Sequence, residues 1–159
     1  MKKLLFIAAL CAMVGACGFR PMYGGGLAPQ LASIYVEPVA EREGYELRNT
    51  LIGLLGSDGV AGGKAYRLAI TLSEANQGVA LQNDATITRY NDTLDVSYEL
   101  SDAKGTVLLR GSQKALSSYN VVASPYATLA AQRDSDKRAA EDVAERIRLD
   151  LGAYFQRRP

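Results

Sequence analysis

Residues 66–73 read YRLAITLS and residues 93–100 read TLDVSYEL. Apolar and polar side chains alternate in both stretches, which predicts two strands, each with one face on a hydrophobic core and one face toward water. The polar face would carry Arg67, Thr71, Ser73, Thr93, Asp95, Ser97 and Glu99. A sheet with one apolar face needs a covering layer, so these two stretches decide the fold class.

Turn chemistry follows the second stretch directly. Residues 101–105 read SDAKG, in which Gly105 can take a positive φ, and we expect a hairpin loop there. Residues 106–118 then return as a third antiparallel strand. A short β-branched and aromatic stretch near the start of the chain, residues 33–37, predicts one more strand, which Pro38 ends.

The alternation of the second stretch does not extend far upstream. Ile87 is out of phase with Leu94, so the parity of apolar positions slips between them. An extra residue in one strand produces such a slip, and we expect a bulge or bend near Asn91 and Asp92.

Two segments have helical periodicity instead. Residues 42–55 place four leucines at helical spacing, Leu47, Leu51, Leu54 and Leu55. Near the end of the chain, Ser124 and Pro125 supply an N-cap and a first helical residue. The helix that follows would turn one apolar stripe to the core, made of Ala140, Val143, Ala144, Ile147, Leu151, Tyr154 and Phe155.

The predicted order is strand, helix, three strands, helix. We therefore expect an α+β fold with two layers, in which a four-stranded mixed sheet carries two helices packed on one face. The first strand reaches the second through a helical crossover and lies parallel to it, while the last three strands form an antiparallel meander. This domain would span residues 31–159.

The first residues form a secretory signal. Lys2 and Lys3 precede the apolar run 4–14, which is too short for a membrane-spanning helix of about 20 residues. Small residues then lead to Cys17, in the sequence VGAC, which resembles the lipobox of bacterial lipoproteins. We expect residues 1–16 to be cleaved, Cys17 to carry the lipid anchor, and residues 17–30 to form a flexible, glycine-rich tether.

Composition narrows the classes of function. The formal net charge of +1 gives no reason to expect a nucleic-acid partner. The chain has no histidine, and its two cysteines lie at positions 11 and 17, within the signal and at the proposed anchor. We therefore expect neither disulfides, metal, cofactor nor enzymatic activity. A carboxylate-dependent hydrolase would need Asp92, Asp95 or Glu99 to meet a second acid, and no spacing supports it.

Both ends of the mature chain resemble one family. Residues 17–24, CGFRPMYG, look like the mature start of the alphaproteobacterial LPS-assembly lipoproteins of the LptE family. Residues 124–131, SPYATLAA, followed by DKRAAE at 136–141, are similar to that family's closing helix. The resemblance implies a non-enzymatic lipoprotein that plugs the LptD β-barrel, supports its assembly and helps lipopolysaccharide (LPS) reach the outer leaflet. It assigns no residue beyond Cys17.

A plug would use the polar sheet face, because a barrel lumen is itself polar. The phosphates of LPS favour cationic contacts. The candidates for contacts with these phosphates, chosen because they lie on strand ends or near the start of the last helix, are Arg89, Arg110, Lys114 and Arg133. Gly18, in place of an acidic residue, suggests sorting to the periplasmic face of the outer membrane. A structural or chaperone lipoprotein of another envelope machine is the alternative that composition leaves open.

Overall fold

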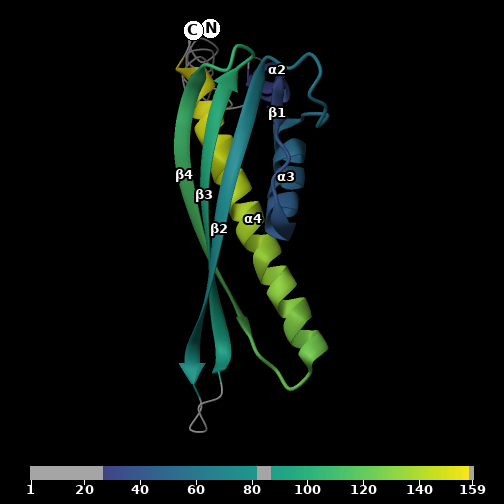
Figure 1. The fold of residues 1–159 in the computed structure, drawn as a ribbon, viewed down its shortest axis with the longest axis vertical. Coiled ribbons are helices and arrows are strands. Elements are labelled where there is room, and N and C mark those ends of the chain that lie inside the picture. Colours follow the sequence, from purple (N-terminus) through teal and green to yellow (C-terminus); the bar gives the residue numbers. More distant parts are fainter. Residues whose placement is uncertain (1–26, 82–86, 158–159) are drawn as a thin grey trace, which may run out of the picture.

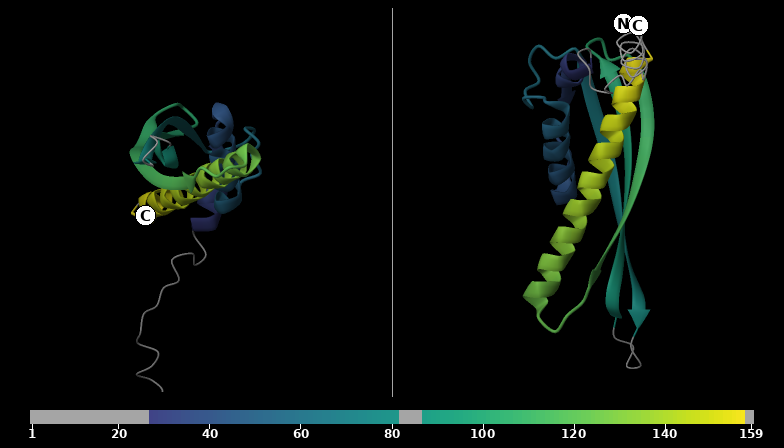
Figure 2. Two further views of the ribbon diagram at one scale, coloured as in Figure 1. Left: turned by 90° about the horizontal axis from the view of Figure 1, so that it is seen from below. Right: turned by 180° about the vertical axis from the view of Figure 1, so that it is seen from behind.

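The computed structural model describes residues 27–81 and 87–157. The elements in chain order are α2 (Leu27–Ala32), β1 (Ile34–Val36), α3 (Glu41–Leu55), β2 (Tyr66–Leu81), β3 (Ile87–Asp102), β4 (Val107–Asn120) and α4 (Pro125–Gln156). Figure 1 shows a long, twisted sheet with α3 and α4 along one side of it. The views in Figure 2 place both helices on the same face.

The strands form one mixed sheet in the order β1-β2-β3-β4. β1 pairs with β2 in parallel, and the other two pairings are antiparallel. The predicted fold class is thus confirmed, since a helical crossover joins the parallel pair and hairpin connections join the rest. Gly105 has the positive φ, 84°, that the tight β3–β4 connection needs.

The core lies between the sheet and the two helices. The predicted stripe of α4 is buried, apart from the partly buried Tyr154, and it faces Leu47 and Leu51 of α3. On the sheet side the core is made of alternate residues of β2 and β3, with Leu68, Val96 and Leu100 fully covered or nearly so. The prediction for Leu54 was wrong, because it lies on the outer side of α3 with 37% of its surface exposed.

A hydrogen-bonded cluster fastens α4 to the sheet. The Tyr98 hydroxyl donates to Asp150 Oδ2 at 2.6 Å, and Gln113 Nε2 donates to the same oxygen at 2.7 Å. Tyr98 packs over Gly111 of β4 so closely that a Cβ there would lie 2.3 Å from its hydroxyl. Glycine is therefore required opposite this tyrosine.

The start of α4 follows from local chemistry. The Ser124 side chain caps α4 by accepting a hydrogen bond from the Ala127 amide at 3.4 Å, as expected.

One helix was not predicted: α2 includes residues 27–30, which the sequence analysis assigns to the tether. Leu27 and Leu31 lie one helical turn apart and pack against the core, which explains why this segment is ordered into a helix.

Both long strands extend beyond the predicted segments, since β2 continues to Leu81 and β3 begins at Ile87. Asn91 and Asp92, where we expected a bulge, pair regularly with Gln77 and Asn76. The register shifts occur farther out, between Gly78 and Leu81 of β2. The change in alternation thus correctly predicted an irregularity in this pair of strands. Its predicted position was wrong, because the irregularity lies nearer the β2–β3 connection and partly on β2.

Candidate functional site

The sheet face turned away from α3 and α4, here called the open face, is polar. Along β2 and β3 it carries the expected exposed side chains, including Arg67, Thr71, Ser97 and Glu99. From β4 it adds a large apolar side chain, Leu116, of which 69% is exposed. Such a surface, polar with an isolated apolar contact point, suits a protein partner whose wall is also polar.

Two of the predicted cations lie in a row on the open face. Arg110 Nε lies 2.8 Å from Glu99 Oε1, and Lys114 Nζ lies 3.2 Å from Asp95 Oδ1. The strand register explains both pairs, because each cation of β4 stands directly opposite its acid on β3. These pairs are solvent-exposed, so they contribute little stability and can exchange for other partners.

The same pairs exclude two of the three acids that the hydrolase alternative named. Asp95 and Glu99 are each neutralised by a cation on the open face. Asp92 points to the opposite side of the sheet, where it is buried. Asp95 and Glu99 therefore meet no second acid, whereas Asp92 lies beside Glu43, Glu74 and Asp136 in a small hollow described below.

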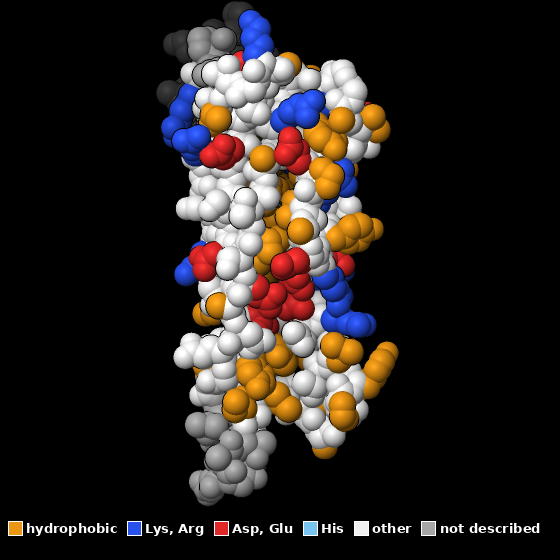
Figure 3. Space-filling model, in the orientation of Figure 1, with side chains coloured by type: hydrophobic (Ala, Val, Ile, Leu, Met, Phe, Trp, Pro, Cys, Tyr) orange, Lys and Arg blue, Asp and Glu red, His pale blue; other side chains and the backbone are white. Residues whose placement is uncertain are grey.

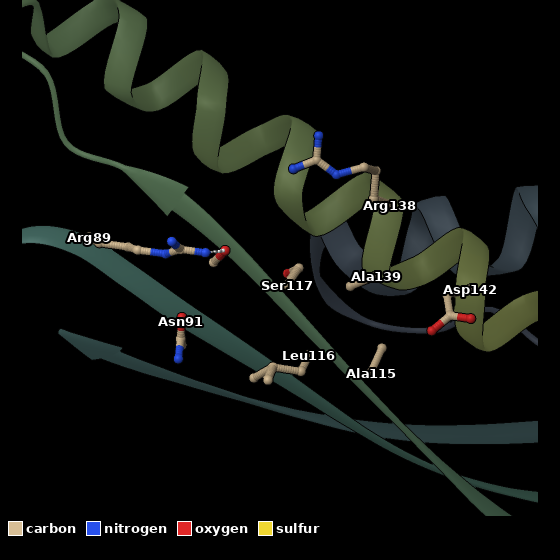
Figure 4. Close-up of a pocket in the computed structure, with 9 residues that line it drawn as sticks. Arg89, Asn91, Ala115, Leu116, Ser117, Arg138, Ala139 and Asp142 are labelled. Atoms are coloured by element: carbon tan, nitrogen blue, oxygen red, sulfur yellow. Dashed lines mark hydrogen bonds between the residues drawn. The ribbon is translucent and has the colours of Figure 1, made fainter. Parts of the chain in front are cut away.

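A groove of about 540 Å³ runs along β4 beside α4 (Figure 4). Residues from both faces of β4 line it, among them Ala115 and Leu116, so it follows the outer edge of the sheet. Arg89 reaches into it from β3 and Arg138 from α4. The groove thus combines apolar side chains with two guanidinium groups.

The two arginines differ in their partners. Arg138 forms an ion pair with Asp134 on its own helix. Arg89 donates to the Ser118 hydroxyl at 2.6 Å, and no carboxylate of the described residues lies within ion-pair distance of it. Arg89 is therefore held in place by a neutral group while its charge stays available for an anion.

The structure places Arg89, Arg110 and Lys114 on adjacent strands but spreads them along the sheet, because Arg89 lies six positions along β3 from the residue opposite Lys114 and ten from the residue opposite Arg110. Arg133 is exposed on α4 and does not line the groove. Sequence analysis did not select Arg138, because it is one of many charged residues in the closing helix. Its proximity to Arg89 depends on how α4 crosses β4, and no local pattern encodes that crossing.

The proposed lipid attachment residue, Cys17, lies outside the described residues, as does the rest of the signal and residues 17–26 of the tether. Within residues 27–81 and 87–157, no helix combines the length and apolar character needed to cross a membrane.

Comparison with known proteins gives a consistent picture. A family model described as LptE, lipopolysaccharide-assembly, matches residues 31–151. An uncharacterized protein of Rickettsia prowazekii (strain Madrid E) is 29% identical over 157 residues, covering 97% of this chain and 98% of the relative. A Caulobacter crescentus CB15 protein, described as a lipoprotein, has a crystal structure with a TM-score of 0.70 and 32% identity, over 83% of this chain and 96% of that one. A minor lipoprotein from Acinetobacter baumannii has the same fold, with a TM-score of 0.61 and 17% identity over 77% and 92% of the two chains.

Proposed function

Because the chain belongs to the LptE lipopolysaccharide-assembly family, we propose that it forms a complex with an LptD-type β-barrel, plugs that barrel and supports its assembly. The family is one of non-enzymatic lipoproteins of the cell envelope. In this role the protein acts by binding, turns over no substrate, and helps insert LPS into the outer leaflet.

The observation that carries the proposal is the open face. A plug must offer a wide polar surface to a polar lumen. The open face does so with exposed ion pairs, Glu99 with Arg110 and Asp95 with Lys114, around the exposed Leu116.

A lipid anchor on Cys17 would hold the domain at the membrane. Cys17 precedes α2 by a short segment, and α2 lies at the end of the sheet opposite the β2–β3 hairpin (Figure 1). With Cys17 lipidated, the domain stays on the periplasmic face of the outer membrane, and its long axis gives the strands reach from the anchor into a barrel. Several acyl chains bind a bilayer far more firmly than one.

The groove beside β4 supplies a direct contact with LPS. Arg89 offers a guanidinium that no carboxylate of the described residues neutralises, Arg138 lies across the groove, and Ala115 and Leu116 offer apolar surface. Lipid A combines phosphate groups with acyl chains, so one groove meets both parts of its chemistry. Arg110 and Lys114 extend the row of cations along the open face.

Capture from solubilised outer membranes tests the complex. The tagged wild-type lipoprotein should co-purify with a translocon barrel, and its depletion should lower the amount of mature barrel and of surface LPS. Normal barrel maturation and normal surface LPS after depletion would contradict the proposal. Capture of an unrelated envelope assembly would favour the alternative role of a structural or chaperone lipoprotein.

The anchor and the LPS contact are tested separately. Cys17→Ser should leave the protein without lipid, with either its signal uncleaved or its domain detached from the membrane fraction. Mass spectrometry of the wild-type amino terminus should find modified Cys17. Arg89→Ala with Arg138→Ala should weaken LPS binding at low salt, where exposed charges are least screened. Arg133→Ala, a loss of charge outside the groove, should bind LPS as the wild type does.

A further inference from the structure

Acidic side chains from four elements meet between the helices and the sheet. Glu43 of α3, Glu74 of β2, Asp92 of β3 and Asp136 of α4 line a small hollow, here called the acidic hollow. Figure 3 shows acidic groups gathered midway along the molecule, where the helices meet the sheet. The hollow has room for about one water-sized group.

Two of these acids are buried without partners. Asp92 is 3% exposed, and burial raises the pKa of its carboxyl. The buried Ser135 hydroxyl lies near enough to offset part of that rise, but it does not reach hydrogen-bond geometry with either carboxylate oxygen. Asp136 is 9% exposed, and its Oδ1 is likewise unpartnered. A buried carboxylate without a hydrogen bond or counter-ion is costly, so a cation that enters the hollow would remove part of that cost.

Burial and mutual repulsion raise the pKa values of the acids in the hollow. Burial raises the pKa of Asp136 to about 6, and the charges of Asp92 and Glu43 add to the rise, while Arg42 opposes it. Burial also raises the pKa of Glu74 to about 6, with Glu43 and Asp136 contributing. None of the four acids forms an ion pair within the described part of the chain.

The chain's own lysines are committed elsewhere. Within the described residues, Lys64, Lys114 and Lys137 pair with Asp58, Asp95 and Glu141, respectively. Lys104 lies in the β3–β4 connection. Residues 82–86, QNDAT, contain no cation. Arg42 opposes the rise in the pKa of Asp136 but forms no ion pair with any of the four acids, so the hollow can still accept a positive charge from another molecule.

The size of the hollow selects the kind of cation. An ammonium group is compact and carries three donors that can turn toward separate carboxylates, whereas a guanidinium is a larger, rigid plane. No set of three or more potential ligands in residues 27–81 and 87–157 is arranged to hold a metal ion. We propose that the acidic hollow receives a lysine side chain of the partner protein, which under the proposed function is the barrel.

The double variant Asp92→Asn with Asp136→Asn tests this proposal in the full lipoprotein. Its matched control is Asp58→Asn with Glu141→Gln, which changes the formal charge equally at two exposed carboxylates that do not line the hollow. Barrel capture from outer membranes should fall at least about tenfold for the double variant, as expected when a buried charge pair loses one member. The control should capture as much barrel as the wild type.

Stability of the free protein separates binding from folding. Asn fills the place of Asp without its charge, so the double variant should have a higher melting temperature than the wild type. Reduced capture together with higher stability would support the proposal. Unchanged capture would overturn it, and so would a lowered melting temperature, because the acids would then be structural.

A direct probe keeps this inference separate from the proposed function. Wild-type lipoprotein that captures no barrel would refute the barrel complex, and ethylammonium chloride would then decide about the hollow. A higher melting temperature than in sodium chloride of equal ionic strength, seen for the wild type but not the double variant, would support an ammonium site. No such difference would overturn the proposal, as would stronger stabilisation by calcium chloride, which would indicate a metal site.

Discussion

The two halves of the long sheet are built differently. In the half near α2, Leu68, Val96 and Leu100 lie under the helices and are almost completely buried. Beyond Leu72, every residue of β2 from Ser73 to Val79 is exposed. The distal half has its own contacts, a stack of Tyr90 on Tyr119 at 5.5 Å and a hydrogen bond from Asn76 to the Tyr119 hydroxyl, but it has no helix over β2.

This difference separates stability from recognition. The proximal half buries apolar side chains from sheet and helices, which is the main favourable contribution to folding. Near the boundary between the halves lie groups that cost stability, Asp92 and Asp136, and beyond them lie exposed apolar groups such as Val79. Under the proposed function, these groups are where a partner would bind.

The comparison is tested most strongly in the proximal core. Ile147 is fully buried, so Ile147→Ala should lower the free energy of unfolding by about 2–5 kcal/mol. Leu149, on the same helix but 42% exposed, is the matched control, and its replacement by Ala should cost less than about 1 kcal/mol. Urea unfolding measures both. Equal losses would show that α4 does not stabilise the fold through its buried stripe.

A second variant tests the close packing of Tyr98, which is hydrogen-bonded to Asp150 of α4, over Gly111 of β4. Gly111→Ala would push the added methyl group into the buried Tyr98 ring and disturb the bond to Asp150, at a cost of about 1–3 kcal/mol. Gly53 lies on the exposed side of α3, where an added Cβ would have no atom within 4 Å, so Gly53→Ala should raise the free energy of unfolding by up to about 1 kcal/mol. Thermal unfolding distinguishes them, and a tolerated Gly111→Ala would refute the tight packing.

The pH dependence of stability tests the boundary between the halves. The pKa of Asp136 in the folded protein is about 6, above its usual 3.8, so the folded state binds the proton more tightly than the unfolded state. The destabilisation by Asp136 is therefore full above about pH 6 and is relieved as the pH falls toward 4, by roughly 1–2 kcal/mol.

Urea unfolding of the wild type and of Asp136→Asn, at about pH 8 and about pH 5, measures this effect. The variant should be the more stable protein at the higher pH, and its advantage should shrink at the lower one. Glu141→Gln, an exposed residue of the same helix, serves as control. If the variant's gain in free energy of unfolding stayed constant with pH, the pKa of Asp136 would not be raised in the folded protein.

The smallest effect on stability is expected on the open face. Leu116 is 69% exposed, so Leu116→Ser should change the free energy of unfolding by less than about 0.5 kcal/mol. The same change should reduce barrel capture, since Leu116 is the apolar contact in a polar surface. A destabilised Leu116→Ser, or one with undiminished capture, would mean that the leucine is not a binding residue.

Local patterns predicted much of this architecture. Alternation in residues 66–73 and 93–100 identified two strands and their apolar faces, and leucine spacing identified α3. The Ser124–Pro125 pair marked the start of α4. The outer parts of the long strands escaped prediction because residues 74–81, EANQGVAL, do not alternate. Their extended form comes from pairing with β3 rather than from a pattern of their own.

The sequence by itself determined which residues seek the core, because side-chain hydrophobicity repeats with the period of each strand or helix. It also carried the family motifs at both ends of the chain. Tertiary structure alone decided which charges meet. Arg138 lies across a groove from Arg89, and Asp136 joins Asp92 and Glu43, only because α4 crosses the sheet at one particular angle. That crossing is set by the packing of the whole core, so residues far apart in the chain become neighbours without any local sign.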